Sequence, residues 1–297
     1  MYYNTFVLRT FVYIRSVKRV DKIKRNERIS AMIKVLSDAP NKIYTLSYFS
    51  DMFGAAKSTI SEDIDLAQGI LERFSLGALE TVTGAAGGVK FLPATSEDAN
   101  RRFVSEMCLR MSDPERILPG GYLYMVDILQ NPTMVARMGE ILAMWFYKTR
   151  PDFVMTVETK GIPVALMVAR SLNVPLVICR RDVRITDGSV VTINYLSGSN
   201  QRIQTMSLPK RSIKEGQRAL IIDDFMKGGG SAKGMMDMLK EFSVVVAGVG
   251  VVMATATPER KMVDDVKALM VLHSVDELNR RVDVRPSAMF SRNDYLR

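Results

Sequence analysis

Two adjacent carboxylates, Asp223 and Asp224, follow an apolar run at 219–222 and stand just before three consecutive glycines at 228–230. The pattern predicts a buried strand, a glycine-rich turn and a helix that begins at Ser231. Backbone N–H groups of such a turn, with the helix N-terminus behind them, form a binding site for anions. Glycine lets the backbone approach a phosphate closely, since it has no side chain in the way.

Side chains around this turn favour a phosphorylated sugar as ligand. Ser231 adds a hydroxyl donor and Lys227 a cation, while the two acids suit a diol or a bound Mg²⁺. Ribose 5-phosphate combines these groups. The turn is not a Walker loop, because no Gly-Lys-Ser/Thr closes it, and the third glycine of the dinucleotide fingerprint is replaced by Lys233. A tight turn before a capped helix is the alternative interpretation.

Two further loops carry groups suited to phosphate. Thr159, Lys160 and Gly161 follow the apolar run 153–157, and Arg180 and Arg181 follow the run 176–179. If these runs are parallel strands, their carboxyl ends meet at one edge of the sheet, where α/β proteins bind ligands. For Lys160 taken alone, a surface lysine in a turn remains an equal alternative.

The elements that must position these loops alternate between strands and helices. Strands are predicted at 153–157, 176–179, 218–222 and 244–253, and helices at 162–172 and 231–242. This order predicts an α/β fold with a parallel sheet that has helices on both faces. Residues 190–196 and 202–208 predict a projecting hairpin, which either closes over a ligand or is an edge hairpin without contacts.

The positive charge is concentrated at the N-terminus. Residues 1–60 hold eleven Lys/Arg and four acids, a net of 11 − 4 = +7, whereas residues 61–297 hold 30 basic and 28 acidic groups, a net of +2. A basic segment on a near-neutral body suggests a polyanion as partner. A solvated basic tail explains the same charge equally well.

The basic segment predicts a winged helix-turn-helix. Apolar spacing indicates helices at 28–39, 46–53 and 58–74, and residues 79–82 and 89–92 flank a glycine-rich turn as two strands. The third helix would be the recognition helix, with its first turn at phosphates or base edges. A protein-binding winged helix is the alternative. The residues predicted to contact DNA are Arg25, Arg28, Lys57, Ser58, Thr59, Ser61 and Lys90.

Composition excludes several classes of protein. The 297 residues predict two domains, and 47% hydrophobic with 25% charged residues is ordinary for a globular protein. Two cysteines indicate reduced thiols and a cytoplasmic location, and the single histidine leaves no His-rich metal site and little room for a Ser-His-Asp triad. No membrane span is expected. Residues 1–20 are interpreted as an N-terminal extension.

Residues 220–231 resemble the phosphoribosyl pyrophosphate (PRPP) motif of type I phosphoribosyltransferases. The chain is still more similar to one non-enzymatic branch, the purine operon regulators (PurR) of Gram-positive bacteria. The stretches that carry this resemblance are 84–90, 114–122, 159–163, 207–212 and 222–227, and it extends from about residue 21 to near 280. It implies a winged helix over 21–94 and a phosphoribosyltransferase fold over 95–297, together in a homodimer.

The resemblance also implies roles for residues. Asp223 and Asp224 would hold the ribose hydroxyls, Thr159, Lys160 and Gly161 would face the pyrophosphate, and Tyr122 would lie near the ligand. A cis peptide bond is expected near Thr159–Lys160, and Glu158 departs from the pattern by placing an acid there. The 5-phosphate would lie in the cradle made by Phe225, Met226, Lys227, Gly228, Gly229, Gly230 and Ser231, with Arg180 and Arg181 near the pyrophosphate.

The function implied is a transcriptional regulator of purine biosynthesis and transport genes that binds double-stranded operator DNA. A repressor is favoured, and an activator is the alternative. PRPP, with or without Mg²⁺, would be its effector in a catalytically inactive pocket, where guanosine polyphosphates could compete. No cofactor or resident metal is required. An active purine phosphoribosyltransferase with an appended winged helix is the alternative.

Overall fold

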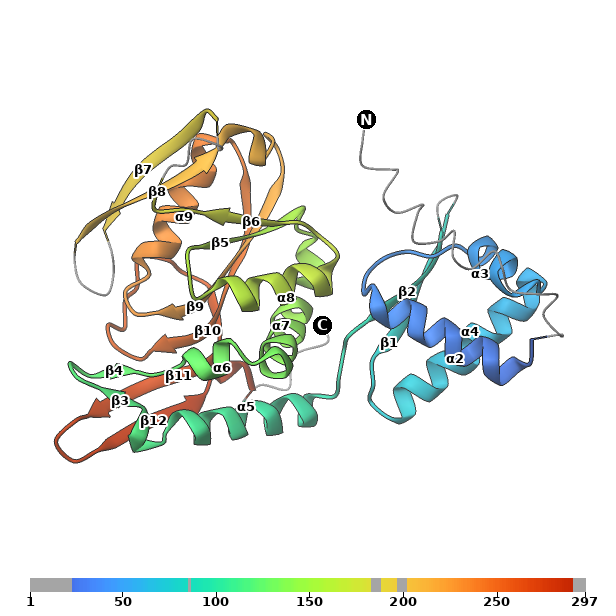
Figure 1. Cartoon of the computed structure of the whole chain (residues 1–297), viewed down its shortest axis with the longest axis horizontal. Helices are drawn as coiled ribbons and strands as arrows, with labels where there is room; N and C mark the ends of the chain where they lie inside the picture. Colours follow the sequence, from blue (N-terminus) through green and yellow to red (C-terminus); the bar gives the residue numbers. More distant parts are fainter. Residues whose placement is uncertain (1–22, 85–86, 183–187, 197–201, 291–297) are drawn as a thin grey trace.

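A computed structural model describes residues 23–84, 87–182, 188–196 and 202–290, so the extension predicted at 1–20 lies outside the described residues. The N-terminal part is the expected winged helix (Figure 1). Its order is α2 (Arg25–Asp38), α3 (Leu46–Phe53), α4 (Lys57–Arg73) and the antiparallel strands β1 (Ala78–Val82) and β2 (Gly88–Leu92). Apolar faces of all five elements form one core.

Local signals explain the start and the end of the short helix α3. The Thr45 side chain accepts a hydrogen bond from the Tyr48 N–H at its N-cap, and Gly54 ends it in the left-handed conformation, with φ 62°. The next helix differs from the sequence-based expectation. Its N-cap is Ala56, so Ser58 lies inside the first turn of α4 rather than at the cap.

A short loop connects the N-terminal part to the C-terminal part. Helix α5 (Glu97–Met111) begins at Glu97, because the Ser96 side chain caps it by accepting a hydrogen bond from the Ala99 N–H. In Figure 1 this helix leads away from the winged helix and along the underside of the second domain. Further on, α6 (Val126–Leu129) and α7 (Pro132–Phe146) form a helix pair, which breaks where Asn131 caps α7.

The second domain is built on a six-stranded sheet in the order β12-β11-β10-β9-β5-β6. Its central strands are β5 (Phe153–Val157), β9 (Arg218–Met226) and β10 (Val245–Thr255), with β6 (Leu176–Cys179) at one edge. All pairs from β6 to β11 are parallel, as predicted. The sequence analysis missed β11 (Val266–Asp276) and the antiparallel edge strand β12 (Arg281–Pro286).

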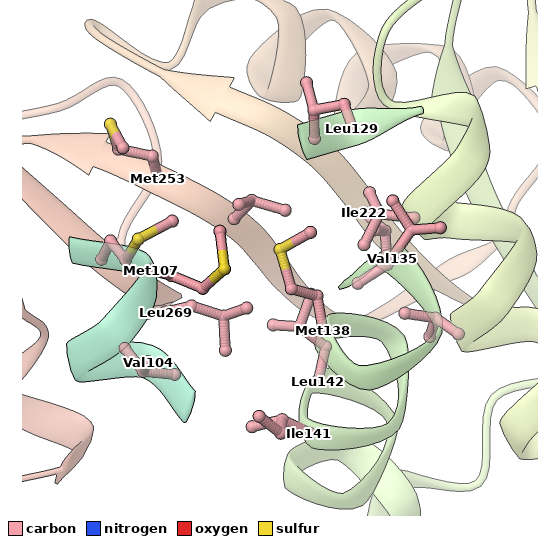
Figure 2. Packing of buried hydrophobic residues seen from close by; sticks show 14 of the residues in the cluster. Val104, Met107, Leu129, Val135, Met138, Ile141, Leu142, Ile222, Met253 and Leu269 are labelled. Carbon is pink, nitrogen blue, oxygen red and sulfur yellow. The ribbon is translucent and has the colours of Figure 1, made fainter. Parts of the chain in front are cut away.

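Helices cover both faces of this sheet. Alternate residues of each strand point to opposite faces and therefore contribute to different cores. Val154 of β5 and Ile222 of β9 lie in one core with α5, α6, α7 and α8 (Ile162–Leu172). Figure 2 shows this core, with Met138 and Leu142 of α7 facing the sheet. Met155 and Ile221 lie in the opposite core, with α9 (Gly230–Glu241) and a hairpin.

That hairpin is the predicted one, formed by β7 (Val190–Leu196) and β8 (Ile203–Pro209). Tyr195 and Met206 from its strands are buried against α9, so the hairpin packs on the domain as well as projecting from it. Both cysteines are free and buried, and burial raises the pKa of the Cys108 and Cys179 thiols to about 12. Within the described ranges, no helix is long and apolar enough to span a bilayer.

Candidate functional site

The two acids of the sequence motif lie near the carboxyl end of β9, a central strand of the sheet. Strand β9 runs on to Met226, so Asp223 and Asp224 belong to the strand and not to the loop after Ile222. Asp223 is 7% exposed, and its Oδ1 accepts a hydrogen bond of 2.9 Å from the Asp224 N–H. Burial, and then the charge of Asp224, raise the pKa of Asp223 well above its usual range. The protein therefore holds this carboxyl in a site that disfavours its charge.

The glycine-rich loop that follows, residues 227–229, leads directly into α9. Gly229 is the N-cap residue of the helix, with φ 85°, a backbone conformation that favours glycine. The first N–H groups of α9, at Gly230 and Ser231, have no acceptor inside the helix, as at any helix start. The loop and helix start therefore have the form of an anion site, as the sequence predicts.

The second predicted loop, residues 158–161, joins β5 to α8 and touches the acid pair. A Cβ on Gly161 would lie 2.6 Å from Asp223 Oδ1 and 2.7 Å from Thr156 Oγ1, so only glycine fits there. Thr159 and Lys160 are exposed at the tip of the loop. The peptide bond between Glu158 and Thr159 is cis, one bond earlier than expected.

Glu158 turns away from the tip of this loop. Its N–H donates to Cys179 O at 2.9 Å, and its carboxylate Oε2 accepts from the Arg181 N–H at 3.3 Å. The acid that departs from the motif is therefore held against the end of β6.

The arginine pair follows β6 at the same edge of the sheet. Arg180 bonds by its backbone to Ser207 of the hairpin, and the positive charge of Arg181 acts on Asp223, lowering its pKa in opposition to the larger effects of burial and Asp224. A cavity of about 380 Å³ lies beside Arg181 and under the hairpin. Its lining is polar and consists of Arg181, Asp182, Thr192, Gln204, Thr205 and Ser207.

Tyr122, which was predicted to lie near the ligand, belongs to a separate small hairpin. It lies on the two-residue strand β4 (Tyr122–Leu123), which pairs with β3 (Ile117–Leu118), and it is 60% exposed. The neighbouring Gly121 lies near Glu277 of the turn between β11 and β12. In the described part of the chain, no contact joins Tyr122 to the acid pair, so its place beside a ligand stays a prediction.

The predicted DNA contacts divide into exposed and buried groups. Lys57, Ser58 and Ser61 are exposed, and Thr59 is partly exposed, all in the first turns of α4. Arg25 is 53% exposed but pairs with Glu62 at 2.9 Å. The first turns of α4 therefore present polar side chains and the Lys57 ammonium to solvent.

Two of the residues predicted to contact DNA are instead largely buried and form ion pairs within the protein. Arg28 is buried, and its Nε lies 2.6 Å from the fully buried Asp63, so its charge neutralises an acid of the winged-helix core. Lys90 is 13% exposed, bonds to the Tyr147 hydroxyl of the second domain, and lies 3.1 Å from Glu80. The hairpin β1–β2 therefore uses its lysine to contact the second domain rather than to face outward.

Two further groups lie beside the acids and the glycine-rich loop: Thr156, which begins the second predicted anion site at 156–161, and Lys261, which the sequence analysis did not assign. Thr156 Oγ1 is buried and has no hydrogen-bond partner among the described residues. Lys261, in the segment after β10, donates to the carbonyl oxygen of Lys227 at 2.8 Å. A lysine in an unassigned loop carries no motif, so no signal in the sequence could have found Lys261.

Comparison with known proteins supports the division into these two parts. The family model described as "Bacterial purine repressor, N-terminal" matches residues 24–93, and the "Phosphoribosyl transferase domain" model matches residues 126–285. The chain is 43% identical over 264 residues to the "Purine biosynthesis transcriptional repressor PurR" of Bacillus subtilis (strain 168), covering 89% of this chain and 93% of that protein.

Two other relatives have names that state a different activity, one a transcriptional activator and one an enzyme. The "Purine biosynthesis transcriptional activator PurR" of Lactococcus lactis subsp. lactis (strain IL1403) is 39% identical over 269 residues, covering 91% of this chain and 99% of that protein. A xanthine phosphoribosyltransferase of Geobacillus thermodenitrificans (strain NG80-2) is 34% identical over 127 residues, covering 42% of this chain and 66% of that protein.

Proposed function

Because the chain belongs to the PurR family of bacterial purine biosynthesis regulators, we propose that it is a DNA-binding repressor of purine biosynthesis and transport genes. Its second domain would bind PRPP as an effector without catalysing phosphoribosyl transfer. The observation that carries this proposal is the buried Asp223 next to Asp224 and the glycine-rich loop, on the same chain as a winged helix whose Lys57 is exposed.

The site chemistry supports PRPP as the ligand. Hydroxyl donors of a ribose would stabilise the charged form of Asp223, which burial and Asp224 otherwise disfavour. The N–H groups of residues 228–231 would bind the 5-phosphate, and the loop 159–161 with Arg180 and Arg181 would face the pyrophosphate. Where Mg²⁺ accompanies the ligand, Asp223 and Asp224 offer the oxygen donors that this cation prefers.

Helix α8 offers a route between ligand and DNA. It begins directly after the loop 158–161, and near its end the Ser171 carbonyl accepts a hydrogen bond of 2.6 Å from Asn41 Nδ2 of the winged helix. PRPP can change DNA binding only if it binds one arrangement of the two domains better than another. A shift of this loop on ligand binding would reach the turn after α2 through α8.

The binding experiment titrates PRPP into a complex of the full chain with a promoter fragment of purine biosynthesis genes. We expect PRPP to weaken DNA binding, as repression relieved by the effector requires. The double variant Asp223→Ala/Asp224→Ala should bind the same DNA and lose the PRPP response. A double variant that still responds would show that the ligand site lies elsewhere, and stronger DNA binding with PRPP would reverse the sign of regulation.

Two further proposals extend this experiment. Guanosine polyphosphates carry a ribose and phosphates, so we expect them to compete with PRPP in the same titration. In the cytoplasm the protein would act as a homodimer, since a two-fold pair of recognition helices reads an operator with two half-sites. Sedimentation of the full chain at the concentration used for DNA binding tests the dimer.

The alternative function is an active purine phosphoribosyltransferase, which the match over residues 126–285 favours. Purified protein is mixed with PRPP and each purine base in turn, and released pyrophosphate is measured. We expect no turnover above the buffer blank. Turnover at the rate of about 1–10³ s⁻¹ common for enzymes would overturn the non-enzymatic interpretation.

A further inference from the structure

The segment 256–265, between β10 and β11, packs against the glycine-rich loop. The Met262 N–H donates a hydrogen bond of 2.9 Å to Gly228 O. A Cβ on Gly229 would lie 3.4 Å from Met262 N and 3.6 Å from Val263 N. Val263 is itself buried in the core beneath α9, so the segment is anchored to the domain. One side of the loop is thus covered by this segment.

Lys261 adds a charged contact to the same side of the loop. Its ammonium nitrogen donates to Lys227 O at 2.8 Å and to Pro258 O at 3.1 Å, and lies 3.5 Å from Thr255 Oγ1. An ammonium group has three N–H donors, and these three oxygens can take all of them. Burial lowers the pKa of Lys261. The lysine is therefore a structural donor to the loop, with no N–H left for a ligand.

These contacts determine where the loop N–H groups point. In a trans peptide unit the carbonyl and the N–H point in opposite directions. Because Lys227 O faces Lys261 and Gly228 O faces Met262, the N–H groups of Gly228 and Gly229 face the other side of the loop. Among the described residues, neither N–H donates a hydrogen bond. Two neighbouring donors are thus left for an anion, beside the start of α9.

We propose that Lys261 is a positioning residue of the phosphate site, which holds the loop 227–229 in the conformation that binds the 5-phosphate of a phosphorylated ribose. This inference rests on the proposed function, because it deepens the same ligand site. Lys261 orients the backbone of the loop and does not touch the ligand.

The test separates the two ends of the ligand. Ribose 5-phosphate and pyrophosphate are titrated separately into the full-length wild type and into Lys261→Met and Lys261→Arg, by calorimetry. We expect Lys261→Met to weaken ribose 5-phosphate binding about tenfold, the lower end of the range known for outer partners that orient binding groups in metal sites. Pyrophosphate binding and effector-free DNA binding should stay within twofold of wild type. Lys261→Arg should restore binding, since it can donate to the same carbonyls.

Lys267 provides a matched control on the same domain. It is also a half-buried lysine whose pKa is lowered by burial, and its Nζ donates to the Trp145 carbonyl at 3.1 Å, away from the loop. Lys267→Met should leave ribose 5-phosphate binding unchanged.

Three results would count against these claims, and they differ from one another. Wild type that binds neither ribose 5-phosphate nor PRPP overturns the proposed function. If wild type binds and Lys261→Met binds equally well, the role of Lys261 is wrong and the proposed function stands. Equal loss of both ligands in Lys261→Met, without rescue by arginine, also overturns the positioning role, because the lysine would then support the whole domain.

Discussion

Asp63 in the winged helix and Asp223 in the second domain are both buried carboxyls, but their surroundings are opposite. Asp63 is fully buried, with Arg28 at 2.6 Å and Arg25 at 3.3 Å. Asp223 has a second acid as its neighbour, and in the described ranges no ion pair includes it. Removing one partner of the Arg28–Asp63 pair would leave an uncompensated charge inside the fold, whereas an acid that no ion pair holds is available to a ligand.

The largest loss of stability is expected when the buried Arg28–Asp63 pair is broken. Arg28→Met leaves Asp63 buried with only Arg25 beside it, and should destabilise the winged helix by about 3 kcal/mol, the low end for a broken buried pair. Hydrogen exchange of the amides in α2 and α4 measures this loss. The control is Arg25→Met, because Arg25 is 53% exposed and its loss leaves the Arg28 pair in place. If these amides were equally protected from exchange in wild type and Arg28→Met, the pairing of Asp63 would not matter for stability, and its contrast with Asp223 would be refuted.

At Asp223, a substitution is expected to stabilise the protein rather than destabilise it. Its pKa is raised in the folded state, so the folded protein keeps a proton that the unfolded chain has lost, and stability falls as the pH rises through the folded-state pKa. Asp223→Asn removes this loss and should be more stable than wild type, with a difference that grows from pH 4 towards neutral pH. Urea midpoints measured across this pH range check it.

The exposed Glu241 at the end of α9 provides the control for this pH series. Glu241→Gln should show no comparable trend relative to wild type. A pH-independent difference between wild type and Asp223→Asn would mean that Asp223 is not held in a site that disfavours its charge.

A smaller effect is expected at the exposed cations of α4. Lys57→Ala removes one phosphate contact, so DNA affinity should fall and the slope of log affinity against log salt should become shallower by about 1. PRPP binding should not change. Arg73→Ala, at the other end of the same helix, should leave the slope as in wild type. A wild-type salt slope near zero would refute the DNA surface altogether.

The smallest effect is expected for an exposed ion pair. Lys34 and Asp38 of α2 form an ion pair, and their side chains are 73% and 59% exposed. Lys34→Ala should change the stability of the winged helix by less than about 0.5 kcal/mol, because water screens exposed pairs. Hydrogen exchange in α2 measures it beside Arg28→Met. A loss as large as that of Arg28→Met would show that burial does not distinguish these pairs.

Local signals predicted most elements of the fold. Strand β5, helix α8 and strand β6 have the bounds expected from their apolar runs, and the Asn131–Pro132 pair marks the start of α7. The strands after residue 265 were missed, because β11 is exposed at 273–274 and β12 at 281 and 285–286, and the sequence analysis recognised no turn motif beside them. The end of β9 was also misplaced, since acids rarely suggest a buried strand.

The residues that bear the ligand motif could be named from the sequence, because a strand, two acids and a glycine-rich turn are contiguous in the chain. The availability of each cation was decided by the tertiary structure alone. Arg28 meets Asp63 35 residues away, and Lys90 meets Tyr147 57 residues away. Lys261 reaches the carbonyl of Lys227 across 34 residues. Whether a charged side chain is bonded inside the fold or free for a ligand depends on packing between distant segments, which no local pattern of residues encodes.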